Sequence, residues 1–234
     1  MMADLRNKRT LILAAAPMES LELRTIFSSD PNGIRRRLES PVELRGFGWG
    51  LAMQQQSKLV GGEFIRTESF REVVDLYRDG YLIVGAEVNR EFLAWSDKDD
   101  LRIHPLALIE LTNNFTRFYE FVLEDLQTRP KKTEFRIYVE NMHLDGKKTR
   151  LPPGEVGSMR WQLSGGLGRE APSNRWSKTI IVASDAQNYK PEGVAFSLIR
   201  GLYFWFGHSE EDIPYARDTN DGKAVDAERI KNIR

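Results

Sequence analysis

The sequence predicts an α+β fold in which a largely antiparallel sheet packs against two main helices. Strand-like segments follow one another in runs and do not alternate strictly with helices. Two segments, at about 105–128 and 191–206, have apolar residues at the three- and four-residue spacing of a helix with one buried face. An Asp-Gly pair at 79–80 joins two β-rich runs, which is typical of a hairpin.

The N-terminal part is predicted to supply several strands. Residues 10–16 form a continuous apolar run that Pro17 ends, as expected of a buried strand. A short helix is expected over 34–40, after the turn sequence DPNG. Alternating glycines and aromatic residues then indicate a close-packed bent strand or loop. Three adjacent antiparallel strands are expected within 63–88.

The helix that begins after His104 is the strongest structural signal. Pro105 suits its first position, where the missing N–H removes no hydrogen bond. We expect Phe118 to be buried on this helix. The predicted buried stripe consists of Leu108, Leu111, Phe115, Phe118, Val122 and Leu126.

The second half is predicted to return to strands before the last helix. Residues 134–141 alternate apolar and polar side chains, which indicates a strand with one wet face. Asp145-Gly146 suggests a second hairpin, and 159–163 (MRWQL) suggests another strand. Residues 176–184 (WSKTIIVAS) are expected to form a strand with a buried middle. Gly207 is placed as the C-terminal cap of the last helix.

Composition places limits on function and location. The 234 residues suit one α+β domain, 1–234, in which 208–234 is polar and is expected to pack loosely. No apolar run approaches membrane-spanning length, so we expect a cytoplasmic protein without a membrane partner. The chain has no cysteine, which excludes disulfides, cysteine-ligated metals and a cysteine nucleophile.

Motifs for catalysis or cofactor binding are not found. No two histidines have the helical spacing of a zinc site, and no serine lies in a GxSxG-like turn. The glycines at 165–168 lack the spacing of a phosphate loop or a dinucleotide fingerprint. Glu134 and Glu140 share one predicted strand, but no lysine stands at a nuclease-like spacing. We therefore predict no catalytic residues, no cofactor and no metal.

Basic residues form three short groups that suggest a nucleic-acid contact. If these loops converge, they could bind phosphates while tryptophans stack on bases. The 34 basic and 34 acidic residues cancel, however, and this favours a solvated surface with the tryptophans in the core. The candidate residues are Arg35, Arg36, Arg37, Lys131, Lys132, Lys147 and Lys148, with Arg150 beside the last pair.

Three stretches together carry a family resemblance. In this order they resemble the region that follows the AlbA_2, or Schlafen-like, domain of some bacterial proteins described as ATP-binding or DNA-binding. The AlbA_2 domain itself has no counterpart in the chain, so no functional residue is carried over. The resemblance implies an accessory domain of a bacterial protein, for example in a defence or regulatory system. The stretches are GFGWGLA (46–52), DLYRDGYLIV (75–84) and the helix at 104–126, with Phe206-Gly207 after the last helix.

Three functions remain open from the sequence. The first is a non-catalytic interaction or sensing domain whose partner is a protein, either another copy or another domain. The second is a nucleic-acid-binding module that uses the basic loops. The third is a metal-dependent hydrolase of unrecognised type, which requires converging carboxylates in a cleft.

Overall fold

The computed structural model describes residues 7–28, 30, 32–40, 43–46, 48–51, 56–69, 71–97, 100–163 and 166–233. Its centre is a seven-stranded sheet in the order β11-β8-β1-β5-β4-β3-β2, and every neighbouring pair is antiparallel. The α+β class and the antiparallel sheet are confirmed. The strands are β1 (Thr10–Pro17), β2 (Lys58–Val60), β3 (Phe64–Glu68), β4 (Glu72–Tyr77), β5 (Leu82–Glu87), β8 (Lys132–Glu140) and β11 (Arg175–Ala183).

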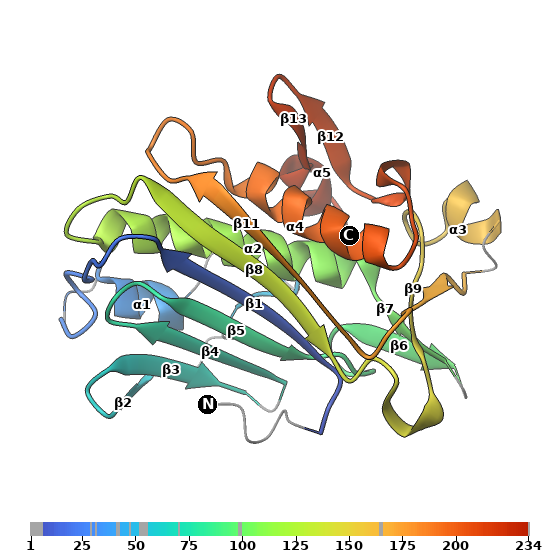
Figure 1. Ribbon diagram of the computed structural model, residues 1–234, viewed down its shortest axis with the longest axis horizontal. Helices are drawn as coiled ribbons and strands as arrows, with labels where there is room; N and C mark the ends of the chain where they lie inside the picture. Colours follow the sequence, from blue (N-terminus) through green and yellow to red (C-terminus); the bar gives the residue numbers. More distant parts are fainter. Residues whose placement is uncertain are drawn as a thin grey trace.

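Two main helices, α2 (Pro105–Asp125) and α4 (Pro191–Trp205), were expected and are present. The helix α2 begins where predicted, because the His104 side chain accepts the Ala107 amide hydrogen and Pro105 follows. Figure 1 looks onto the large sheet, with α2 and the short helix α1 (Ile34–Glu39) behind it. Neighbouring residues of a strand point to opposite faces, so every second side chain points toward these helices, and most of those side chains are apolar.

The core lies between the sheet and the helices. Phe118 is fully buried, as predicted from the helical stripe. Phe135 of β8 meets Phe115 and Tyr119 of α2 edge-on, with ring centroids 6.2 Å and 5.2 Å apart. The alternation predicted for β8 is also confirmed, since Phe135, Ile137 and Val139 are all buried. No helix among the described residues is long and apolar enough to span a membrane.

A smaller four-stranded sheet replaces the second predicted hairpin. Its order is β10-β9-β7-β6, and it includes one parallel pair, β7 with β9. Asp145 and Gly146 do make a tight turn with positive φ. The strand after this turn, β9, pairs with β10 and β7 and not with β8. The hairpin prediction is wrong because β9 forms its hydrogen bonds with strands that are distant in the sequence and not with the strand before the turn. The elements are β6 (Ala94–Asp97), β7 (Asp100–Ile103), η3 (Leu144–Gly146), β9 (Thr149–Leu151) and β10 (Arg169–Glu170).

Two further predictions are corrected by the structure. Residues Met159–Leu163 form a short helix, α3, and not a strand; the Ser158 hydroxyl accepts the Trp161 amide hydrogen at its start. The strand β11 exists, but its middle is not buried. It lies at the edge of the large sheet, so Ile180 and Val182 are only half-buried and Ile181 is exposed.

The C-terminal residues are folded onto α4. The hairpin of β12 (Ala216–Thr219) and β13 (Gly222–Val225) is followed by α5 (Ala227–Lys231), and Figure 1 shows them above α4. Val225 and Ile230 are buried in the same apolar core as the sheet residues. The loose packing expected for 208–234 therefore does not describe these residues, because apolar side chains between the charged ones anchor the segment.

Candidate functional site

The arginines of α1 are held by neighbouring groups. The Arg36 guanidinium lies 2.8 Å from a Glu39 oxygen, and Arg35 donates to the Ser57 hydroxyl at 2.8 Å. Arg37 lies over the Phe121 ring, 4.2 Å from its centroid, and 3.8 Å from Glu124. These contacts neutralise or shield positive charge, so α1 does not offer three free cations.

The other predicted basic residues lie apart from α1 or are also paired. Lys148 and Arg150 share the carboxylate of Glu170, at 2.9 Å and 2.5 Å. In Figure 1, α1 lies at the left end of the molecule and β9, with the turn that contains Lys147 before it, at the right end. Lys131 and Lys132 lie at the start of β8, which is at the left end in Figure 1 as α1 is, so two of the groups share one end and the third lies away from them. The three groups thus do not converge on a single surface.

The histidines and carboxylates that a hydrolase would need are engaged in hydrogen bonds and ion pairs within the fold. His143 and His208 each place a ring nitrogen near a backbone carbonyl, that of Ala171 at 2.8 Å and that of Leu151 at 2.7 Å. Glu134 pairs with Arg136, and Glu140 pairs with Arg175. In the part of the chain that the structure describes, no group of three or more acidic or histidine side chains is placed to hold a metal ion.

A buried ion pair that sequence analysis missed joins the glycine-rich loop to α2. Arg45 makes two parallel bonds to Glu110, at 2.6 Å and 2.9 Å, and the Trp49 amide donates to the same carboxylate at 3.3 Å. Gly48 leaves room for this carboxylate, because a Cβ at this position would lie 2.9 Å from a Glu110 oxygen and would push it away. The sequence did contain a signal for this ion pair. Glu110 lies among the apolar residues of a largely buried helix, where a charge needs a partner.

The surroundings of this ion pair are desolvated. Burial, followed by the charge of Glu110, raises the pKa of Glu43. Burial, followed by the charge of Arg45, lowers the pKa of His104 to about 4, so this histidine is neutral at physiological pH. His104 also contacts the rings of Trp49 and Trp95, at 5.1 Å and 4.8 Å between centroids. The Arg45 and Glu110 charges neutralise each other. The ion pair therefore holds the glycine-rich loop against α2 and offers no free acid–base pair.

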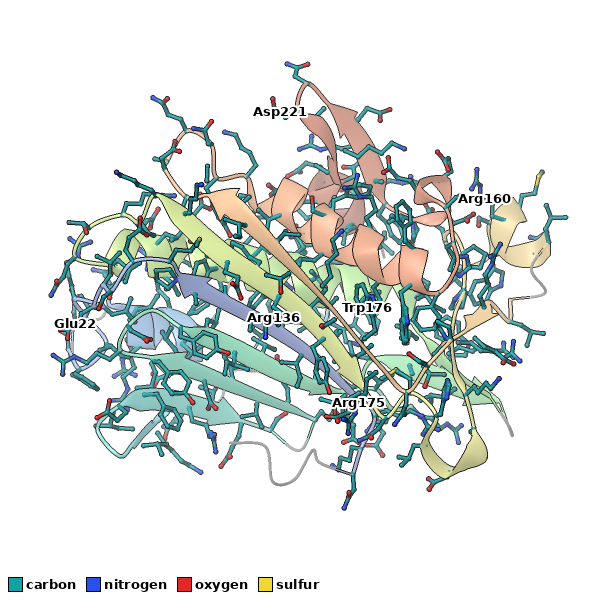
Figure 2. The ribbon with its side chains drawn as sticks, viewed as in Figure 1. Glu22, Arg136, Arg160, Arg175, Trp176 and Asp221 are labelled. Atoms are coloured by element: carbon teal, nitrogen blue, oxygen red, sulfur yellow. The ribbon has the colours of Figure 1, made fainter. Side chains whose placement is uncertain are left out.

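The outer face of the large sheet points away from α2, and no other layer covers it in Figure 1. Two shallow hollows adjoin there and share Asp79, in the turn between β4 and β5. One is about 390 Å³ and is floored by the three alanines at 14–16 of β1. The other is about 280 Å³ and extends toward Glu22. We call these two hollows and their rim the Asp79 surface. Figure 2 shows Arg136 on the near side of the sheet and Glu22 at its left end.

The Asp79 surface combines aromatic rings with an excess of carboxylates. Tyr77 lies between Phe64 and Tyr81, with ring centroids 4.7 Å and 5.5 Å away. Four carboxylates and two guanidinium groups line the hollows, and both guanidinium groups are paired, Arg78 with Glu22 and Arg136 with Glu134. The acidic groups are Glu22, Glu63, Asp79 and Glu134. This chemistry repels phosphate and suits a polar and aromatic protein contact.

Comparison with family models, with curated proteins and with solved structures finds no match for this chain.

Proposed function

We propose that this chain is a non-catalytic protein-interaction module and that the Asp79 surface contacts the partner. The observation that carries the proposal is an uncovered sheet face that has aromatic rings, small residues at its floor and charges of both signs. Tyrosine-rich surfaces with a polar rim are typical of protein interfaces, which use aromatic area more than net charge.

The charge of this surface favours a protein over a nucleic acid. The carboxylates of Glu63 and Asp79 add negative charge beside Tyr77 and Tyr81, the rings that would otherwise stack on bases. The basic residues named from the sequence are divided between opposite ends of the molecule, and most are near carboxylates. The resemblance to the region after the AlbA_2 domain supports the same proposal, because it implies an accessory domain.

A charge-reversal experiment tests the proposal. Immobilised wild-type protein is used to capture partners from a nuclease-treated extract, and a captured protein is then purified and titrated by calorimetry. Glu134→Lys alters the Asp79 surface, and Glu228→Lys on α5 makes the same charge change elsewhere. The two variants are matched, since each glutamate pairs with a basic residue close by in sequence, Arg136 or Lys231.

We expect Glu134→Lys to weaken the purified complex by at least about tenfold, since reversal of a charge within an interface costs several kcal/mol. Glu228→Lys should leave the affinity within about twofold, as exposed charges outside an interface contribute little. Equal affinity for both variants would refute the assignment of the surface. Salt-sensitive binding of purified DNA or RNA would replace it with the nucleic-acid alternative.

A further inference from the structure

The strand β11 is a long edge strand without a second neighbour. It spans Arg175–Ala183 and pairs with β8 on one side only. The opposite edge of the sheet is the three-residue strand β2, which is too short to template another chain. Natural proteins protect edges by such shortness, by charges or by covering them, because an unpaired row of backbone groups binds other strands. The β-branched sequence TIIV in β11 makes this edge the more adhesive one.

The unpaired backbone groups of β11 can be identified from its hydrogen bonds. The Ser184 amide donates to the Lys131 carbonyl, so residues of even number turn their N–H and C=O toward β8. Alternation then turns those of Ser177, Thr179 and Ile181 toward the free edge. Among the described residues, these three have no hydrogen bond there to another backbone group.

The core is incomplete along the same edge. The side chains of β11 that point toward α4 are Trp176, Lys178, Ile180 and Val182, and each is only half-buried. In the neighbouring strand β8, the equivalent inward side chains are fully buried. On α4, Phe204 remains 50% exposed. One more strand beside β11 would therefore cover apolar area that the isolated chain leaves in water.

Lys178 gives this edge a preference for negative charge. Its ammonium contacts the Ser197 carbonyl at 3.4 Å, and no carboxylate lies within ion-pair distance of it in the described structure. Burial, followed by the charge of Arg200, lowers its pKa. Arg200 is itself paired with Glu210 at 3.1 Å. Lys178 is therefore the half-buried cation that an added carboxylate would stabilise, from the inward side of a new strand opposite it.

The position of α4 decides what kind of strand fits. A Cβ on Gly201 would lie 2.3 Å from Lys178 Cδ and 3.2 Å from Trp176, so this helix runs directly against the inward face of β11. A second copy paired through β11 would bring its own α4 to the same face. Paired strands are about 4.8 Å apart, whereas packed helices need 8–10 Å. A single extended segment without a helix avoids this clash.

We propose that an extended, acidic segment of a partner protein adds to β11 as an eighth strand of the large sheet and places a carboxylate against Lys178. This goes beyond the proposed function, because it concerns the edge of the sheet and not the Asp79 surface, and because it names the chemistry of the bound segment. Backbone hydrogen bonds supply the affinity in this mode of recognition, and the inward side chains supply the selectivity.

The test uses the full chain and two synthetic peptides. The first is a nine-residue peptide of alternating threonine and valine with a central glutamate, and the second has lysine in place of the glutamate. Thr179→Pro removes one free-edge N–H and leaves the bonds to β8 intact, because that N–H points away from β8. Thr179→Ala is its matched control, since it loses the same hydroxyl and keeps the N–H. Lys178→Met tests the charge.

Fluorescence anisotropy should show that the glutamate peptide binds at least about tenfold more tightly than the lysine peptide. Thr179→Pro should abolish binding, Thr179→Ala should retain it, and Lys178→Met should remove the preference for glutamate. Amide exchange should slow at Ser177, Thr179 and Ile181 when the peptide is bound. An unfolding midpoint close to that of the wild type shows that Thr179→Pro is folded, and Ser177→Pro serves as a second variant of the same kind.

Three results would overturn this inference: no binding of either peptide, binding that Thr179→Pro and Ser177→Pro leave unchanged, or equal binding of both peptides. A concentration-dependent dimer that Thr179→Pro abolishes would replace the acidic segment with a second copy. None of these results bears on the Asp79 surface, whose test is the Glu134→Lys variant, so the two proposals fail separately.

Discussion

Removal of Arg45 should destabilise the protein more than neutralisation of its partner Glu110. The reason is the difference in exposure: the Glu110 side chain is fully buried, whereas 16% of the Arg45 side chain reaches solvent. Among the described residues, Arg45→Met leaves the carboxylate with the Trp49 amide, at 3.3 Å, as its one remaining donor. A buried charge that loses its partner costs about 3–5 kcal/mol, so we expect a loss in that range.

Glu110→Gln should cost less. The amide oxygen can still accept from Arg45, and the guanidinium keeps its contact with water. The variant also relieves the charge repulsion that, after burial, raises the pKa of Glu43. Loss of a hydrogen bond between charged groups costs about 1.5–3 kcal/mol. The double variant Arg45→Met/Glu110→Leu should recover much of the loss of Arg45→Met, because apolar replacement of both partners leaves no unpaired charge.

Urea unfolding followed by tryptophan fluorescence measures these free energies, since the chain has five tryptophans. Lys231→Met is the control: it breaks an exposed pair with Glu228 and should cost no more than about 1 kcal/mol. The reasoning is refuted if Arg45→Met costs no more than Lys231→Met, or if Glu110→Gln is the more damaging of the two single variants.

Three other predictions concern the interior and the same loop. Phe118→Ala should cost about 3–5 kcal/mol in urea unfolding because Phe118 is fully buried, and a loss under about 1 kcal/mol would contradict its place in the core. The pKa of His104 is lowered from 6.5 to about 4 in the fold, so stability that is present above pH 6.5 is lost as the pH falls toward 4. His104→Asn keeps the helix cap and should make the melting temperature less dependent on pH between 6.5 and 4. An unchanged pH dependence would contradict the role given to His104. Glu43→Gln should raise the melting temperature at neutral pH, because the raised pKa of Glu43 marks an ionised form that the fold disfavours, and this gain should vanish as the pH falls through that pKa.

Secondary structure was predictable where local chemistry and burial agree. The apolar spacing around Phe118 and the proline at position 105 located α2, and Asp79-Gly80 located the β4–β5 turn, where Gly80 has a φ of +81°. Two of the corrected predictions, the second hairpin and the strand at 159–163, lie where local chemistry has two solutions. Asp145-Gly146 forms a tight turn whether or not the next strand pairs with the previous one, and five residues such as MRWQL fit a short strand or one helical turn.

The candidate surfaces were much less predictable. The groups at 35–37 and 131–132 lie at one end of the molecule and the group at 147–150 lies at the other, and the sequence alone does not place them. The Asp79 surface combines residues from β1, β4, β8 and the turn between β4 and β5, which only the strand order brings together. The bond between Arg45 and Glu110 was missed for the same reason, since the two residues are 65 positions apart.

The sequence by itself determined the α+β class, the two main helices and most of the buried residues, because periodicity and turn chemistry act over a few neighbouring positions. Only the tertiary structure decided that β11 is an edge strand, that β9 joins a second sheet and that residues 208–233 pack on α4. Each of these features depends on which segments of the chain become neighbours in the fold. That choice is made by the summed burial and hydrogen bonding of the whole chain, and no local stretch of the sequence contains it.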